Sequence, residues 1–197
     1  MDADVYAPPK ADLEIDDGVL EEFYVVSKSK FLTLYLSTLG LYGIYWYYRN
    51  WKQQKQAHGL SIWPLPRAIF QVFFIHSLFR AISDGLRRNG LSYAWNAGSV
   101  ATPLVIITLI SNVADRLSAK DIGEPWTGLI SLATLFVMAA LLNLAQGAVN
   151  AACKDPQGLS NKEFSGANIV WIVLGVIFWA LALFGTIGPL FAPAFFE

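Results

Sequence analysis

Three ionisable side chains, His76, Arg80 and Asp84, recur four residues apart near the end of an apolar segment. Residues at this spacing lie on one face of a helix, so the pattern predicts a single mixed-charge stripe. An imidazole changes its charge near neutral pH, which makes His76 the group that could titrate at a proton-linked site. The simpler interpretation is an interfacial stripe, in which an arginine extends toward the membrane surface and pairs with an aspartate.

A second stripe consists of three side-chain amides, Asn143, Gln146 and Asn150, at helical spacing. Amides inside a membrane helix either hydrogen-bond to neighbouring helices or line a wet cavity. Two long apolar segments separate the loops that follow the two stripes, so both stripes are predicted on one side of the membrane and at similar depth. The two stripes together are the best candidate in the sequence for a polar binding patch. Hydrogen bonding between helices is the alternative role.

The other polar and ionisable residues give no sign of a catalytic or metal-binding site. Asn112, Asp115 and Arg116 form a cluster at the opposite membrane surface, where they are expected to cap the interface. The chain has two histidines and one cysteine, Cys153, which excludes an internal disulfide and leaves too few ligands for a histidine-built metal site. It lacks a glycine-rich phosphate loop, a His-Glu-x-x-His motif and a Gly-x-Ser-x-Gly elbow. We therefore predict no catalytic residue, no metal and no cofactor.

The composition is that of a membrane protein. Hydrophobic residues make up 55% of the 197 residues, charged residues only 15%, and the mean hydropathy is +0.44. A soluble domain carries about 25% charged residues, so this chain is far short of a solvated surface. A backbone in hydrocarbon must satisfy its own hydrogen bonds, which favours helices. The predicted fold is therefore all-α, a polytopic membrane helical bundle.

Three apolar segments are predicted to cross the membrane, at residues 97–114, 126–150 and 167–191. They make residues 96–197 a three-helix transmembrane bundle. Ser160 and Glu163 are expected to form a capping box before the last segment. Residues 1–25 are acidic and lack apolar periodicity, so they are predicted to form a flexible tail.

The intervening residues 26–95 carry two less regular apolar segments, at residues 31–48 and 64–89, joined by an interfacial helix. Gly40 and Gly43 interrupt the first segment, and charged residues punctuate the second. A full crossing needs about 20 apolar residues, so each segment is expected either to cross the membrane or to re-enter it. The predicted total is four to five transmembrane segments.

Lysine and arginine residues predict the orientation. The loops after the second and fourth segments share a side, and the loop between them, with Arg116 and Lys120, lies opposite. The 14 basic residues divide 8 to 6 if both N-terminal segments cross, and 12 to 2 if neither does. Basic loops remain in the cytoplasm, so both counts predict an extracytoplasmic C-terminus.

Residues 40–51 read GLYGIYWYYRNW, and residues 62–70 read IWPLPRAIF. Together with the Ser-Leu-Phe-Arg stretch at residues 77–80, they resemble a family of uncharacterised bacterial inner-membrane proteins. The resemblance covers mainly the N-terminal half of the chain. It implies a location in the bacterial inner membrane and assigns no functional residue.

These features predict a non-enzymatic membrane protein, with an accessory, scaffolding or lipid-interacting role. The alternative is a small transporter or channel protomer that uses the cytoplasmic-side polar patch. The expected partners are membrane lipids, together with another membrane protein or a second copy of this chain. Nothing in the charge distribution suggests binding to nucleic acid.

Overall fold

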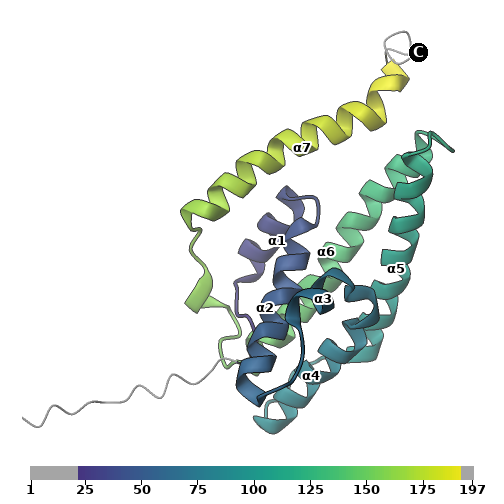
Figure 1. Cartoon of the computed structure of the whole chain (residues 1–197). Coiled ribbons are helices and arrows are strands. Elements are labelled where there is room, and N and C mark those ends of the chain that lie inside the picture. The colour runs from purple at the N-terminus through teal and green to yellow at the C-terminus, as the bar shows by residue number, and fades with distance from the viewer. Residues whose placement is uncertain (1–21, 192–197) are drawn as a thin grey trace, which may run out of the picture.

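The computed structural model describes residues 22–191, and within residues 187–191 it describes only the backbone. Every regular element in this range is helical, as Figure 1 shows, which confirms the all-α prediction. The helices are α1 (Lys28–Ser37), α2 (Leu41–His58), α3 (Pro64–Ile69), η1 (Gln71–Phe73), α4 (Ile75–Arg88), α5 (Ala97–Ser118), α6 (Trp126–Ala152), η2 (Leu159–Asn161) and α7 (Gly166–Phe191).

Three of the described helices are long and apolar enough to cross a membrane. They are α5, α6 and the Gly166–Thr186 part of α7. The predicted crossings at 97–114, 126–150 and 167–191 are thus confirmed as membrane-compatible helices. Three such helices support a multi-pass membrane protein, but they do not support the predicted total of four to five spans.

The first N-terminal segment, predicted at residues 31–48, is divided into two helices. α1 ends at Ser37, and the chain then turns through Leu39 and Gly40, both of which have positive φ. At 1.5 Å per residue α1 is only about 15 Å long, half of the length that a crossing needs. α2 is longer, but its second half, from Arg49 on, is polar. The second segment, residues 64–89, is divided further, into α3, η1 and α4.

The α1–α2 hairpin begins and ends at the same end of the molecule. The Glu22 carboxylate lies 2.9 Å from Arg88 and 3.5 Å from His58, the last residue of α2. The side chain of Asn89 donates to the carbonyl oxygen of Ala152, which places the C-termini of α4 and α6 at this end as well. The chain therefore runs from residue 22 to the hairpin tip and then back to the end of the molecule where it began.

The hairpin tip reaches between α6 and α7. A Cβ atom at Gly175 of α7 would overlap the carbonyl oxygen of Ser37, so the two backbones are in direct contact there. The Trp179 indole donates to the carbonyl oxygen of Leu36 at 2.7 Å. Gly40, at the tip, packs against the side chain of Leu135 in α6. As Figure 1 shows, α1 thus lies between α6 and α7.

An extended segment, residues 23–26, passes through the core before α1. These side chains are buried, although the prediction had placed residues up to 25 in a flexible tail; residues 1–21 of that tail lie outside the described range. No neighbouring strand within the described residues satisfies the backbone of the segment. Side-chain amides of Asn50, Gln146, Asn150 and Asn161 do so instead. Buried backbone groups need such partners, so these four amides fix the path of the segment.

Candidate functional site

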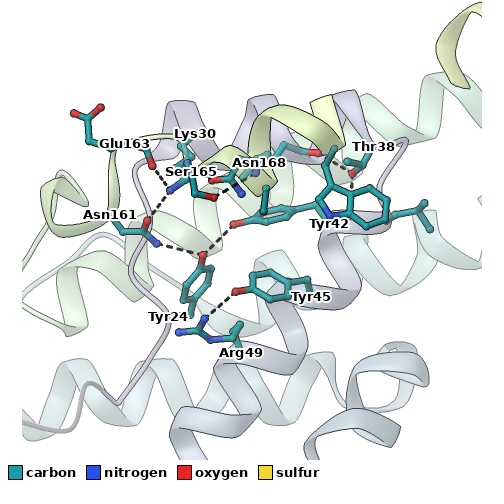
Figure 2. Close-up of a pocket in the computed structure, with 14 residues that line it drawn as sticks. Tyr24, Lys30, Thr38, Tyr42, Tyr45, Arg49, Asn161, Glu163, Ser165 and Asn168 are labelled. Atoms are coloured by element: carbon teal, nitrogen blue, oxygen red, sulfur yellow. Dashed lines mark hydrogen bonds between the residues drawn. The ribbon is translucent and has the colours of Figure 1, made fainter. Parts of the chain in front are cut away.

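A pocket of about 570 Å³ opens between the α1–α2 hairpin, the loop after η2 and the first turns of α7. Figure 2 shows its polar lining residues. The full lining consists of Tyr24, Lys30, Leu34, Thr38, Leu41, Tyr42, Tyr45, Arg49, Asn161, Glu163, Ser165, Ala167, Asn168 and Trp171. Segments from both halves of the chain therefore build it.

The pocket is cationic at one end and apolar along one side. Lys30 precedes the turn residue Leu39 by nine positions, and Arg49 follows Gly40 by nine, so both cations stand at one level of the antiparallel hairpin. At 1.5 Å per residue this level lies about 13 Å from the tip. The interval between cations and tip is lined on one side by the apolar side chains of Leu34, Leu41 and Trp171, and the hydroxyl-bearing Thr38, Tyr42 and Tyr45 also line it.

Tyr24 lies between the two cations, as Figure 2 shows. Its hydroxyl oxygen accepts hydrogen bonds from Tyr42 at 3.4 Å and from the Asn161 amide at 3.2 Å. The Arg49 guanidinium lies 4.6 Å from the centroid of its ring. Burial raises the pKa of Tyr24, so its phenol is neutral at physiological pH.

The ammonium of Lys30 is held by neutral oxygens. It donates to the Asn161 side chain at 2.6 Å and to the backbone carbonyl oxygen of Glu163. Burial lowers the pKa of Lys30, and the Glu163 carboxylate partly opposes this effect. An ammonium has three N–H groups, so these two oxygens leave one N–H without an oxygen acceptor; the Phe164 ring centroid lies 6.0 Å from the ammonium nitrogen.

Arg49 is half-buried and also lacks a carboxylate partner within the described residues. Its one described hydrogen bond is to the Tyr45 hydroxyl, at 2.8 Å, and its remaining contacts are with the faces of Tyr24 and Tyr45. A guanidinium donates in several directions, so most of its N–H groups remain free to bind an anion.

The loop that closes the pocket is ordered by local caps. The Asp155 carboxylate accepts from the backbone N–H groups of Leu159 and Ser160, which begins the η2 turn that carries Asn161. α7 is capped by the reciprocal bonds of Ser165 and Asn168. The predicted capping box at Ser160 and Glu163 is therefore wrong, because α7 begins only at Gly166.

Two of the three predicted stripe amides are core residues. Gln146 and Asn150 are fully buried and bind the backbone of the extended segment; Gln146 also accepts from the Trp46 indole. Asn143 is partly exposed, and its buried Oδ1 has no hydrogen bond in the described structure. This arrangement matches the alternative role of these amides, which is to join elements together.

The ionisable stripe lies on the exposed face of α4. His76 contacts the Thr102 hydroxyl of α5 at 3.2 Å, Arg80 is exposed, and Asp84 pairs with Arg87 at 2.6 Å. Within residues 22–191 no hydrogen bond or ion pair links this stripe to the amide stripe. The structure therefore does not join the six residues of the predicted patch into one cluster, and a binding role for them stays a prediction.

The cluster predicted at the opposite membrane surface is also exposed. Asn112 and Arg116 are exposed on α5, and Asp115 accepts a hydrogen bond from Ser131 of α6. This contact ties the two helices together close to their connecting loop.

The comparisons with known proteins found no relative of this chain. No protein-family model, curated protein or solved structure matches this chain. The resemblance of residues 40–51 to a bacterial inner-membrane family therefore stays a prediction.

The sequence interpretation did not single out the pocket residues. Tyr42, Tyr45 and Arg49 share one helical face within the 40–51 stretch, and that spacing is the signal that was available. Tyr24 and Lys30 gave no comparable signal, because their neighbours in space are distant in the chain.

Proposed function

We propose that this chain is a non-enzymatic integral membrane protein that holds a membrane lipid in the pocket between the α1–α2 hairpin and α7. The polarity of the pocket carries the proposal. Lys30 and Arg49 form a polar end, and Leu34, Leu41 and Trp171 form an apolar side. A lipid has the same two parts, a polar headgroup and a hydrocarbon chain.

In this proposal the α1–α2 hairpin is re-entrant. It enters the membrane from the side of the basic loops and returns to that side. The contacts of Glu22 with His58 and Arg88 support this path, as does the packing of the tip against Gly175. The three remaining helices then cross, which agrees with the division of basic residues as 12 to 2. We place the basic side in the cytoplasm of a bacterial inner membrane and the C-terminus outside.

The alternative role, as a transporter or channel protomer, would need a cavity along His76, Arg80, Asn143 and Asn150. The pocket of about 570 Å³ is lined by none of these four residues, nor are two other pockets in the described part of the chain. The lipid-binding role therefore has the stronger support.

Native mass spectrometry of the full chain in a mild detergent tests the proposal. We expect lipid adducts on the wild-type protein and their loss from Ala167→Trp, which places an indole ring among the residues that line the pocket. Ala180→Trp is the matched control, because Ala180 is exposed on the same helix and does not line the pocket. Absence of lipid from the folded wild-type protein, or equal retention by both variants, would refute the proposal.

A further inference from the structure

We infer that the bound lipid is recognised through its phosphate, and that Lys30 and Arg49 select an anionic glycerophospholipid. This inference rests on the proposed function and adds the chemical class of the ligand. Three observations support it: the two cations at one end of the pocket, the contact of Arg49 with the rings of Tyr24 and Tyr45, and the distance from the cations to the hairpin tip.

Both cations lack a carboxylate partner among the described residues. Lys30 is held by an amide oxygen and a backbone carbonyl oxygen, and Arg49 by a tyrosine hydroxyl. Partly buried cations are stabilised most by charge-assisted hydrogen bonds to an anion. A phosphate offers several oxygens that can accept from the N–H groups of these side chains.

The one carboxylate at the rim does not neutralise this end. The Glu163 side chain is 88% exposed and lies 3.9 Å from Lys162. In Figure 2 it is turned away from the pocket, while its backbone carbonyl oxygen accepts from Lys30. The polar end therefore keeps an excess of positive charge, which favours a lipid with net negative charge.

The tyrosine rings do not offer a site for a choline ammonium. Quaternary ammonium groups bind the faces of aromatic rings. Here one face of Tyr24 and one face of Tyr45 lie against the Arg49 guanidinium, with 4.6 and 5.7 Å to the ring centroids. A choline ammonium beside these two rings would stand next to the positive charge of Arg49, which disfavours phosphatidylcholine.

The length of the pocket fits a lipid better than a soluble phosphate. The distance from the cations to the hairpin tip, about 13 Å, is close to half of a hydrocarbon core that is about 30 Å thick. A phosphate bound at Lys30 and Arg49 would thus stand at headgroup depth, with an acyl chain beside Leu34, Leu41 and Trp171. A soluble phosphate compound would leave this apolar side uncovered.

The test uses the full chain in nanodiscs that contain equal parts of phosphatidylglycerol and phosphatidylcholine. Native mass spectrometry after transfer to detergent counts the retained lipids, and a thermal melt confirms folding. We expect an excess of phosphatidylglycerol on the wild-type protein. Arg49→Gln and Lys30→Gln should each reduce this excess by about tenfold, the effect of losing one charge-assisted contact. Arg116→Gln, which removes an exposed cation at the other surface, should leave the excess unchanged.

The outcomes separate the inference from the proposed function. Equal retention of the two lipids by the wild-type protein would overturn the anionic selectivity and leave the lipid-binding role intact, whereas no retention would overturn both. Inorganic phosphate that competes as well as long-chain phosphatidylglycerol would overturn the lipid as the source of the phosphate. If a glutamine variant does not fold, Arg49→Lys and Lys30→Arg decide instead. Each conserves the positive charge and should keep the excess, and loss of the excess from both folded variants would count against recognition by charge.

Discussion

The side-chain amide of Asn150 forms two hydrogen bonds with the backbone of Val26. Its Nδ2 donates to the carbonyl oxygen at 2.9 Å, and its Oδ1 accepts from the N–H at 3.4 Å. The amide thus takes the place of a neighbouring strand for the buried extended segment. Because this segment carries Tyr24, an amide in α6 determines where the central ring of the pocket lies.

Replacing Asn150 by leucine should destabilise the protein strongly. The change leaves the N–H and the carbonyl of Val26 unpaired in the core, which costs about 1–3 kcal/mol for each group. Chemical unfolding in detergent measures the loss. Asn143→Leu is the control, because the Asn143 Oδ1 makes no hydrogen bond in the described structure and its loss should change the unfolding free energy little. Equal effects of the two changes would contradict the role of Asn150.

Gly175→Ala should separate α7 from the hairpin tip. The added methyl group would overlap the carbonyl oxygen of Ser37, and backbone atoms cannot move aside as a side chain can. We expect a lower unfolding temperature. Gly185→Ala, on the same helix, meets no atom within 4 Å and should be neutral or stabilising by up to about 1 kcal/mol, the usual gain of alanine over glycine in a helix. A Gly175→Ala protein as stable as Gly185→Ala would show that the two backbones are not in contact.

Gly158→Ala tests the contact between the loop and the extended segment. Gly158 and Gly59 have nearly the same φ, +65° and +61°, so alanine brings similar backbone strain of about 1–2 kcal/mol at both. Only at Gly158 does the new Cβ meet other atoms, 2.6 Å from the backbone of Val26 and Ser27. Gly158→Ala should therefore lower the unfolding free energy more than Gly59→Ala. The difference between the two variants isolates the contact from the strain.

Asp155 should make the loop sensitive to acid. Burial acts to raise the pKa of Asp155, but hydrogen bonds from the backbone N–H groups of Ser160 and Leu159 outweigh this effect and hold the pKa below its ordinary value. A lowered pKa stabilises the fold above the unfolded-state pKa, and this contribution disappears as the pH falls through the folded-state pKa.

Asp155→Asn should therefore be less stable than wild type at about pH 7 and lose less stability on acidification to about pH 3. Thermal melts at both pH values measure this. Asp121→Asn, in the α5–α6 loop, is the control, because the Asp121 carboxylate accepts no hydrogen bond within the described residues. If Asp155→Asn has the same pH dependence as wild type, the carboxylate does not stabilise the loop.

The orientation can be tested with single cysteines in a Cys153→Ser background. A cysteine at Lys120, in the α5–α6 loop, should react with a membrane-impermeant maleimide in intact cells. A cysteine at Lys162, next to η2, should react only after the inner membrane is permeabilised. The reverse pattern would show that the basic loops do not lie in the cytoplasm.

The membrane-compatible helices could be predicted closely, whereas the N-terminal half could not. An uninterrupted apolar run such as residues 126–150 encodes its own helix, because hydrocarbon leaves the backbone no other hydrogen-bonding choice. Residues 31–48 are apolar too, but the turn at Leu39 and Gly40 divides them. Local composition does not reveal that the resulting hairpin returns to the end of the molecule where it began, since its path depends on contacts of Glu22, Ser37 and Gly40 with distant residues.

Composition and spacing within single segments were enough to predict a helical chain, three segments long and apolar enough for a membrane, and the positions of the basic loops. The contacts of Gln146 and Asn150 in the core, and the pocket that Lys30 and Arg49 share around Tyr24, became evident from the folded chain alone. Buried polar groups must form hydrogen bonds, and in this fold several of their partners are more than a hundred positions away in the chain. Helical spacing predicts only which nearby residues share a face, so it cannot predict these contacts.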